Sequence, residues 1–201
     1  MTIKILQSVL LCKYLQNKSI SIDIAKKECK EILLNNMGKE QSVLAFANVS
    51  GGYEVRNDSV NDCIGPKDIS YIRNTQKIIE ATTCCVFNDF IDYLSFLTIQ
   101  SLNNLNLKNN RKHDYLILNS IENLDSAVNI LSLYDCIYCF FNNDECGGNT
   151  KHRLVLKLGN RNVYDVSNYY KDYKSVSDFL INKFHVHHLA DEQCKRGRGR
   201  R

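Results

Sequence analysis

The segment that decides the fold opens with Ser120-Ile-Glu-Asn-Leu-Asp-Ser-Ala-Val-Asn-Ile-Leu131 and ends at Phe184. In this opening run the apolar residues from Leu124 to Leu131 recur at the spacing of one helix face, and Ser120 can cap the free N–H groups of the first turn. A short apolar and aromatic run, Cys136-Ile-Tyr-Cys-Phe-Phe141, follows and ends in polar residues. Such a run is typical of a strand. We therefore expect a helix followed by a strand.

The second half of the segment predicts a hairpin and a closing helix. Leu154, Leu156 and Leu158 share one face of an extended chain over 152–158, and Gly159-Asn160 can supply the positive φ angles of a tight turn into 162–166. Ser175 and Asp178 have the spacing of a capping box, and helical periodicity follows them. The segment thus predicts the order α-β-β-β-α, an antiparallel three-stranded sheet with flanking helices.

The rest of the chain predicts a helical region before this module. Helical periodicity marks 3–37 and 69–97, whereas two apolar runs around Gly51-Gly52 suggest a β-hairpin at 43–56. Residues 103–114 are dense in asparagine and charge, as a linker would be. We therefore predict an α+β protein with a mainly helical region at 1–102, a linker at 103–114, an α+β module at 115–188 and a flexible basic tail at 189–201.

The composition indicates a folded intracellular protein. Of the 201 residues, 44% are hydrophobic and 24% are charged, which is ordinary globular usage. The nine cysteines are an odd number, and the apolar start of the chain lacks a signal-peptide cleavage site. No apolar stretch is long enough to cross a membrane. We expect a reducing, cytoplasmic location, and a nuclear one if the basic tail acts as an import signal.

Positive charge is concentrated at the C-terminal end. Residues 150–189 hold seven Lys and Arg against three Asp and Glu, and the tail Cys194-Lys-Arg-Gly-Arg-Gly-Arg-Arg201 adds five more basic residues. Arginine can fork onto phosphates and stack on bases, while glycine keeps such a tail mobile. The tail therefore suggests nucleic-acid binding or nuclear import, and the alternative is a solvated chain end.

Four side chains of the segment have the chemistry of zinc ligands: Cys136, Cys139, Cys146 and His152. Residues 136 and 139 would point to opposite faces of an uninterrupted strand, so both reach one metal ion only if the backbone turns between them. The alternative makes Cys136 and Cys139 ordinary buried thiols. We favour the alternative, and accordingly predict no cofactor.

No catalytic motif is evident, because the cysteines lack histidine and acid partners in the sequence and no glycine-rich phosphate loop is present. We therefore predict a protein that is not an enzyme. The α-β-β-β-α order resembles the double-stranded-RNA-binding domain, in which the loop after the first strand and the start of the last helix face phosphates. By position, this resemblance implies contacts from 142–152 and from Lys171 and Lys174.

The pairing of a Cys/His cluster with an arginine-rich run also resembles small cysteine-rich nucleic-acid-binding proteins of plant RNA viruses, several of which suppress RNA silencing. Both resemblances imply sequence-independent binding of RNA, mainly duplex RNA, by a viral accessory factor that meets host proteins. The phosphate contacts would come from basic side chains, namely Lys151, Arg153, Lys171, Lys174, Lys195, Arg196, Arg198, Arg200 and Arg201. The alternative is a protein-interaction adaptor whose tail only localises it.

Overall fold

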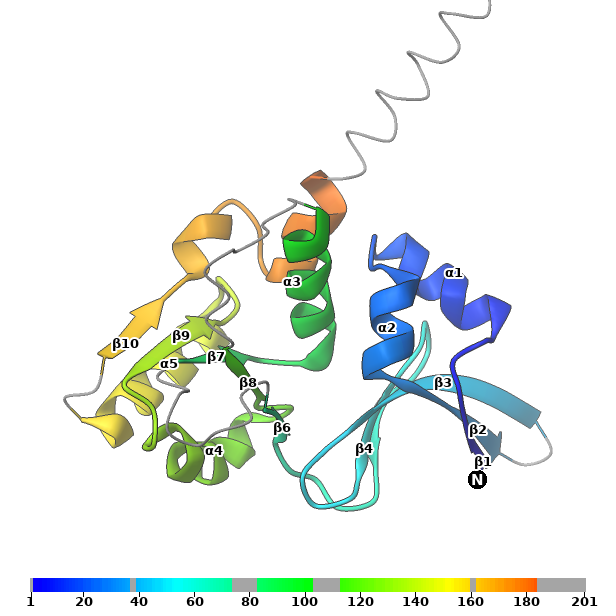
Figure 1. Ribbon diagram of the computed structural model, residues 1–201, viewed down its shortest axis with the longest axis horizontal. Helices are drawn as coiled ribbons and strands as arrows, with labels where there is room; N and C mark the ends of the chain where they lie inside the picture. Colours follow the sequence, from blue (N-terminus) through cyan, green and yellow to red (C-terminus); the bar gives the residue numbers. More distant parts are fainter. Residues whose placement is uncertain (1, 37–38, 74–82, 103–112, 160–161, 184–201) are drawn as a thin grey trace, which may run out of the picture.

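The computed structural model describes residues 2–36, 39–73, 83–102, 113–159 and 162–183, which form two five-stranded sheets with helices (Figure 1). The first sheet is antiparallel throughout and contains, in spatial order, β1 (Thr2–Lys4), β2 (Lys30–Asn36), β3 (Lys39–Ala47), β4 (Tyr53–Arg56) and β5 (Asn61–Ile64). The second has the order β10 (Asn162–Asp165), β9 (Cys136–Phe140), β7 (Thr83–Phe87), β8 (Asp114–Ile117) and β6 (Ser70–Ile72). Its first four strands are parallel, and β6 is antiparallel.

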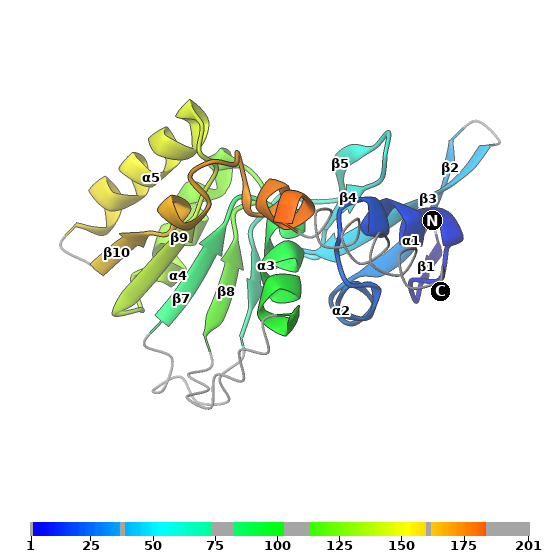
Figure 2. The ribbon, with the colours of Figure 1, turned by 90° about the horizontal axis from the view of Figure 1, so that it is seen from above.

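The helices lie between and around these sheets. They are α1 (Val9–Asn17), α2 (Ile22–Glu28), α3 (Phe90–Leu102), α4 (Leu124–Leu131), α5 (Glu145–Leu158), the 3-10 turns η1 (Ile121–Asn123) and η2 (Ser167–Tyr170), and a helix at 176–183. Figure 2 shows α3 on one face of the second sheet and α4 and α5 on the other. Among the described residues, no helix is long and apolar enough to cross a bilayer.

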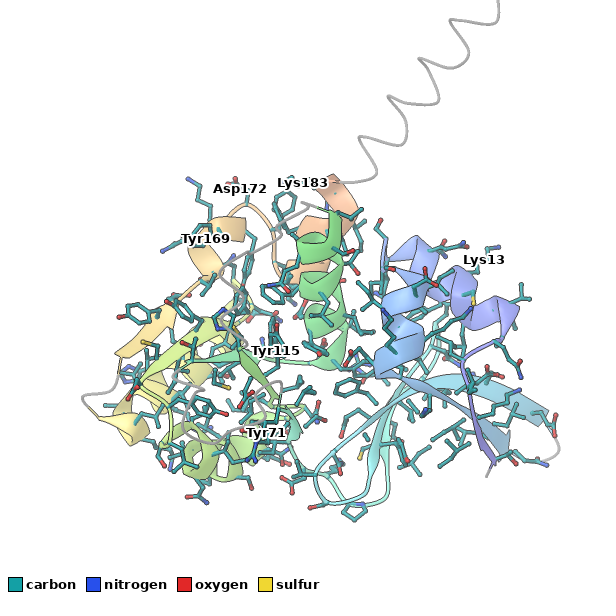
Figure 3. All side chains as sticks on the ribbon, viewed as in Figure 1. Lys13, Tyr71, Tyr115, Tyr169, Asp172 and Lys183 are labelled. Atoms are coloured by element: carbon teal, nitrogen blue, oxygen red, sulfur yellow. The ribbon has the colours of Figure 1, made fainter. Side chains whose placement is uncertain are left out.

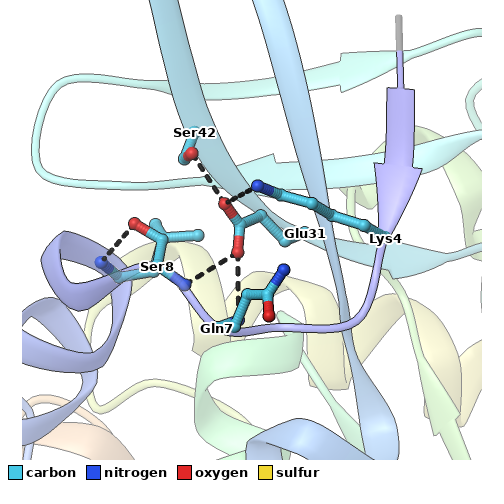
Figure 4. Close-up of polar contacts among 6 residues, drawn as sticks. Lys4, Gln7, Ser8, Glu31 and Ser42 are labelled. Atoms are coloured by element: carbon cyan, nitrogen blue, oxygen red, sulfur yellow. Dashed lines mark hydrogen bonds and ion pairs between the residues drawn. The ribbon is translucent and has the colours of Figure 1, made fainter.

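A buried carboxylate joins the start of the chain to the first sheet (Figure 4). Glu31 of β2 is fully buried and accepts hydrogen bonds from the backbone N–H groups of Gln7 (3.0 Å) and Ser8 (2.9 Å) and from the Ser42 hydroxyl (2.7 Å). The ammonium group of Lys4 lies 3.3 Å away. Burial acts to raise the pKa of Glu31, but these donors together hold it below its ordinary value. The contacts fix the turn from β1 into α1.

A continuous apolar core connects the two halves of the molecule. Leu11 and Leu15 of α1 pack in the same cluster as Phe46 of β3, Phe87 of β7 and Leu94 of α3. The rings of Phe46 and Phe90 stack at 5.3 Å between centroids. Because α3 contributes both to this cluster and to the cover of the second sheet, the N-terminal half and the parallel sheet form one packed unit.

The chain order creates a switch point in the parallel sheet. From β7 the chain runs through α3 to β8 on one side, and then through α4 to β9 on the other side of β7. In open sheets of this kind, ligands bind outside the carboxyl ends of the strands where the winding direction changes. The winding reverses between β7 and β9, so the carboxyl edge of the sheet around these two strands is the first place to look for a site.

The predicted α-β-β-β-α module is wrong, although the α+β class is consistent with the structure. The strand at Cys136–Phe140, the helix at Leu124–Leu131 and the helix capped by Ser175 are confirmed. The predicted hairpin is instead α5 followed by β10, and β10 pairs with β9 in parallel. Leu154 and Leu158 are buried one helical turn apart, whereas Leu156 is 68% exposed. The alternation of leucines therefore belongs to a helix with one leucine on its outer face.

The N-terminal region is less helical than predicted. Ile32 and Leu33 lie in β2, Ile72 ends β6, and Val86 lies in β7, although the spacing of all four predicts helices. Of these strands only β7 is parallel on both sides and buried at every residue. Such a strand is apolar on both faces and lacks the alternation that distinguishes a strand from a helix. Residues 103–112 of the predicted linker and the whole tail at 189–201 lie outside the described residues, so the predicted domain boundaries stay predictions.

Candidate nucleotide site at the strand ends

A cavity of about 450 Å³ opens beside the carboxyl ends of β9 and β10. Its wall is formed by the turn from β9 into α5, by the first two turns of α5 and by the chain that follows β10. The side chains that matter for its chemistry are those of Asn142, Asp144, Glu145, Lys151, Asp165 and Lys171.

The turn from β9 into α5 is fixed by a cap and by a glycine. Asp144 is the N-cap of α5, and its Oδ1 accepts a hydrogen bond from the N–H of Gly147 at 2.9 Å. This hydrogen bond, assisted by the ammonium group of Lys174, holds the pKa of Asp144 below its ordinary value. A Cβ on Gly147 would lie 2.0 Å from the backbone oxygen of Asn142, whereas one on Gly148 would meet no atom within 4 Å. Only a glycine therefore fits at 147.

Asn143 holds the chain after β10 against the end of β9. Its side-chain amide donates to the carbonyl oxygens of Ser167 (3.2 Å), Tyr170 (3.0 Å) and Tyr173 (3.0 Å), and its backbone N–H donates to that of Lys174 at 2.7 Å. The segment 167–174 is thereby placed beside the cavity. Figure 3 shows Tyr169 and Asp172 projecting outward from this segment, and both are exposed.

Two lysines predicted as phosphate contacts, Lys151 and Lys171, line this cavity, and a third, Lys174, pairs with Asp144 of its wall. The ammonium group of Lys151 pairs with the Asp165 carboxylate, and that of Lys174 lies 3.3 Å from Oδ2 of Asp144. Lys171 is exposed and lines the cavity. Burial acts to raise the pKa of Asp165, but hydrogen bonds from Lys151 and from Ser167 hold it below its ordinary value. Basic groups from α5 and from the chain after β10 therefore converge on one site.

Arg153, a further predicted phosphate contact, is not among the residues that line this cavity. Arg153 is exposed on α5, where it adds to the effect of Lys157 in holding the pKa of Asp125 below its ordinary value. The tail residues Lys195, Arg196, Arg198, Arg200 and Arg201 lie outside the described residues.

The four predicted zinc ligands are not brought together. Cys136 is half-buried and Cys139 is buried in the core under α4 and α5, while Cys146 and His152 are exposed on α5. Burial raises the pKa of the Cys139 thiol, which disfavours the thiolate that zinc requires. Within the part of the chain that the structure describes, no three Cys, His, Asp or Glu side chains gather as a metal site.

The end of β7 carries two further acids. Asp89 accepts hydrogen bonds from the N–H groups of Ile91 and Asp92 at the start of α3, and its Oδ2 lies 3.8 Å from a guanidinium nitrogen of Arg56. Asp92 is buried and accepts a hydrogen bond from the N–H of Ser177 at 2.9 Å. Burial, with the nearby Asp89 charge, raises the pKa of Asp92 to about 8. Asp92 thus joins α3 to the helix at 176–183.

A second cavity, of about 480 Å³, lies between α1, the β4–β5 turn and the helix at 176–183. Tyr14, Lys18 and Arg56 line it, with the ammonium group of Lys18 lying 5.4 Å from the centre of the Tyr14 ring. Its other lining residues are mostly neutral and polar. This cavity lies away from the ends of β9 and β10.

The sequence reasoning missed the acids and amides at the strand ends. Asn142, Asp144 and Asp165 each lie within a few residues of the end of a strand in the parallel sheet. In the sequence, the polar run after the strand at Cys136–Phe140 indicates only where that strand ends. Asp144 followed by the acidic Glu145 is a signal for a helix start, but Gly147 and Gly148 obscure it because glycine is a poor helix former.

Comparison with known proteins places this geometry in a context. The chain matches the primase fragment of the bacteriophage T7 primase-helicase protein with a TM-score of 0.59, over 88% of this chain and 71% of that one, at 15% sequence identity. The chain has the fold of a primase domain. It also matches a chain in the structure of bacteriophage T7 lagging-strand DNA polymerase interacting with primase domains of two gp4 subunits bound to an RNA/DNA hybrid and dTTP. That match has a TM-score of 0.51 and 15% identity and covers 75% of this chain and 76% of that one.

Sequence comparisons add little to this similarity. The model of a domain of unknown function (DUF8464) matches residues 1–65, which include the first sheet and both N-terminal helices. No curated protein matches the chain significantly.

The fold similarity corrects several predictions. The likeness to double-stranded-RNA-binding domains and to plant viral silencing suppressors is wrong, because the matched structures are primase domains. The function predicted from it, a viral RNA-binding accessory factor, is wrong for the same reason, and the adaptor alternative has no support. The prediction that the protein is not an enzyme is also contradicted by this similarity to primase domains.

Proposed function

We propose that this chain is a primase-like domain that acts in DNA replication and that binds a nucleoside triphosphate in the cavity beside β9 and β10. The observation that carries the proposal is the position of this cavity, at the carboxyl ends of parallel strands in a sheet with the winding of a nucleotide-binding fold. The T7 structure whose primase domains are bound to an RNA/DNA hybrid and dTTP supports the same class of ligand.

The chemistry of the cavity suits a triphosphate. Lys151 and Lys171 line the cavity, and Lys174 lies beside Asp144 of its wall. Their ammonium groups can bind phosphate oxygens as mobile point charges. The cavity also meets the N-terminus of the 14-residue helix α5, where backbone N–H groups and the helix dipole favour an anion. Gly148 leaves open space there, so that a phosphate can approach the backbone closely. A volume of about 450 Å³ is in the range of small-molecule sites.

We propose nucleic acid as the macromolecular partner, in the form of a DNA template with a short RNA primer. The support is the RNA/DNA hybrid named for the T7 primase domains. The base of a nucleoside triphosphate bound at the strand ends would pair with such a template.

The test is the affinity for ATP carrying a fluorophore on its ribose, followed by fluorescence polarisation. Lys171→Ala is the main variant, because Lys171 lines the cavity and is exposed, so its loss should not disturb the fold. The matched control is Lys13→Ala, which removes an exposed lysine of α1 (Figure 3). We expect Lys171→Ala to weaken binding about tenfold, the size of one charge-assisted contact, and the control to bind as the wild type does. Absence of nucleotide binding by the wild-type protein would refute the proposal.

A further inference from the structure

The start of the chain carries an exposed apolar strip, formed by Ile3, Ile5, Val9 and Leu10. These side chains are between 42% and 81% exposed, and they are four of the twelve exposed large apolar side chains of the described residues. Together they leave roughly 500 Å² open to solvent, near the upper end of the largest apolar patch on a typical monomer, and such patches are often functional. Figure 1 shows β1 and α1 at the end of the molecule opposite to β9 and β10. The strip is therefore separate from the cavity at the strand ends.

The strip follows the open edge of the first sheet. Among the described residues, β1 is the outer strand and pairs only with β2, so no strand lies along its other backbone edge. An edge strand of this kind pairs readily with another chain unless charged side chains or proline prevent it. The only charged residue of β1 is Lys4, and its ammonium group lies 3.3 Å from the buried Glu31. This ion pair leaves β1 without a free charge to prevent pairing.

The strip is held in one conformation by contacts on either side of Ile5. Glu31 accepts hydrogen bonds from the N–H groups of Gln7 and Ser8, which fix the chain between β1 and α1 (Figure 4). Leu6, which lies within the strip, is fully buried in the core. The exposed apolar side chains are therefore preorganised, and binding a partner does not require the chain start to be ordered first.

A row of β-branched side chains crosses the first sheet and ends at this edge. Directly paired residues of antiparallel strands carry their side chains on the same face. Val43 of β3 is paired with Ile32 of β2, and Ile32 is paired with Ile3 of β1. Val43 and Ile32 are fully buried in a small apolar cluster, whereas Ile3 at the end of the row is exposed. A β-branched side chain on an added strand would continue the row.

We propose that β1 of a second copy of this chain supplies that strand, so that two β1 strands pair antiparallel about a two-fold axis at Ile3. In this register Ile3 faces Ile3 of the second copy and Thr2 faces Lys4, so no like charges meet. An axis perpendicular to the sheet leaves both α1 helices on the same face, where Val9 and Leu10 of the two copies can meet. Covering the strip on both copies buries roughly 1,000 Å², the area that a specific interface needs.

The first experiment is sedimentation equilibrium of the full chain in reducing buffer over a range of protein concentrations. We expect a monomer–dimer equilibrium with a micromolar dissociation constant, in keeping with the modest area. Val9→Glu should raise this constant about tenfold or more, because it places a charge in the contact, and should keep the wild-type melting temperature, because Val9 is exposed. The matched control is Leu133→Glu, which changes a similarly exposed residue after α4 and should dimerise as the wild type does.

A wild-type protein that stays monomeric at the highest concentration would overturn the inference. So would a Val9→Glu protein that dimerises as tightly as the wild type, because the dimer would then use another surface. Neither measurement involves a nucleotide, so either result leaves the proposed nucleotide site standing.

A disulfide cross-link tests the register. Ile3→Cys places the two Cα atoms about 4.5–5.5 Å apart across the axis, which a disulfide spans. Thr2→Cys places its two Cα atoms about 8 Å apart, which is too far. After oxidation with copper phenanthroline, we expect covalent dimer above the wild-type background for Ile3→Cys and none above it for Thr2→Cys. Any other pattern would contradict the proposed pairing.

Discussion

Replacement of Asp92 by asparagine should stabilise the protein at neutral and alkaline pH. Asp92 is buried at the start of α3, and burial raises its pKa to about 8. Between about pH 4 and pH 8 the folded protein therefore holds a proton that the unfolded chain has released. In that interval, stability falls as pH rises, by up to about 1.4 kcal/mol per pH unit, and it levels off above the folded-state pKa.

Asparagine keeps the shape of the side chain and an oxygen that can accept the hydrogen bond from the N–H of Ser177. It has no proton to release, so its free energy of unfolding does not fall with pH as that of the wild type does. The difference in free energy of unfolding between Asp92→Asn and the wild type should therefore grow from near zero at pH 4 to a few kcal/mol at pH 8, as the difference between the folded and unfolded pKa of Asp92 requires. Urea denaturation at several pH values measures both proteins. The exposed Glu40→Gln is the control, and its difference from the wild type should not follow pH in this way. A variant less stable than the wild type at pH 8, or a pH-independent difference, would refute the reasoning.

Three further predictions, made with five substitutions, test the packing. Glu31→Gln should lower the free energy of unfolding by roughly 2–4 kcal/mol, because it removes a buried charge that accepts several hydrogen bonds. Since the pKa of Glu31 is lowered in the folded state, this loss, measured by denaturation, should shrink as the pH falls through that pKa. Gly147→Ala should lower the melting temperature and weaken nucleotide binding because its Cβ meets a backbone oxygen, whereas Gly148→Ala should be neutral or stabilising by about 0.5–1 kcal/mol. Leu154→Ala should lower the free energy of unfolding by about 2–5 kcal/mol, and Leu156→Ala by less than about 0.5 kcal/mol, as measured by urea denaturation. Equal losses for the two variants would indicate the strand that the sequence suggested rather than α5.

Local signals in the sequence predicted the elements whose patterns are unambiguous. The helix at Leu124–Leu131 has a clear apolar face, and Ser175 does cap the last described helix, with its hydroxyl 3.2 Å from the N–H of Asp178. The strand at Cys136–Phe140 is short, apolar and ended by polar residues. In each case the signal lies within the element itself.

The rest of the fold depends on contacts that sequence patterns do not carry. The pairing of β9 with β10 is parallel and spans α5, so neither strand signals its partner. β7 is buried at every residue, and only Asn88 and Asp89 separate its apolar run from that of α3. For the site, the lysines at 151, 171 and 174 were predicted by position from the resemblance to the double-stranded-RNA-binding domain, with the local excess of positive charge. Their meeting with Asp144 and Asp165 follows from the sheet topology alone.

The most direct test of the proposed site is photoaffinity labelling with an ATP analogue that carries an azide on the base, followed by peptide mapping. The account predicts that the label falls in peptides within 141–174, which contain the residues that line the cavity beside β9 and β10, and that unlabelled ATP prevents it. Label in peptides around Tyr14 and Lys18 would place the nucleotide in the second cavity. That result, or labelling that ATP does not compete, would contradict the account.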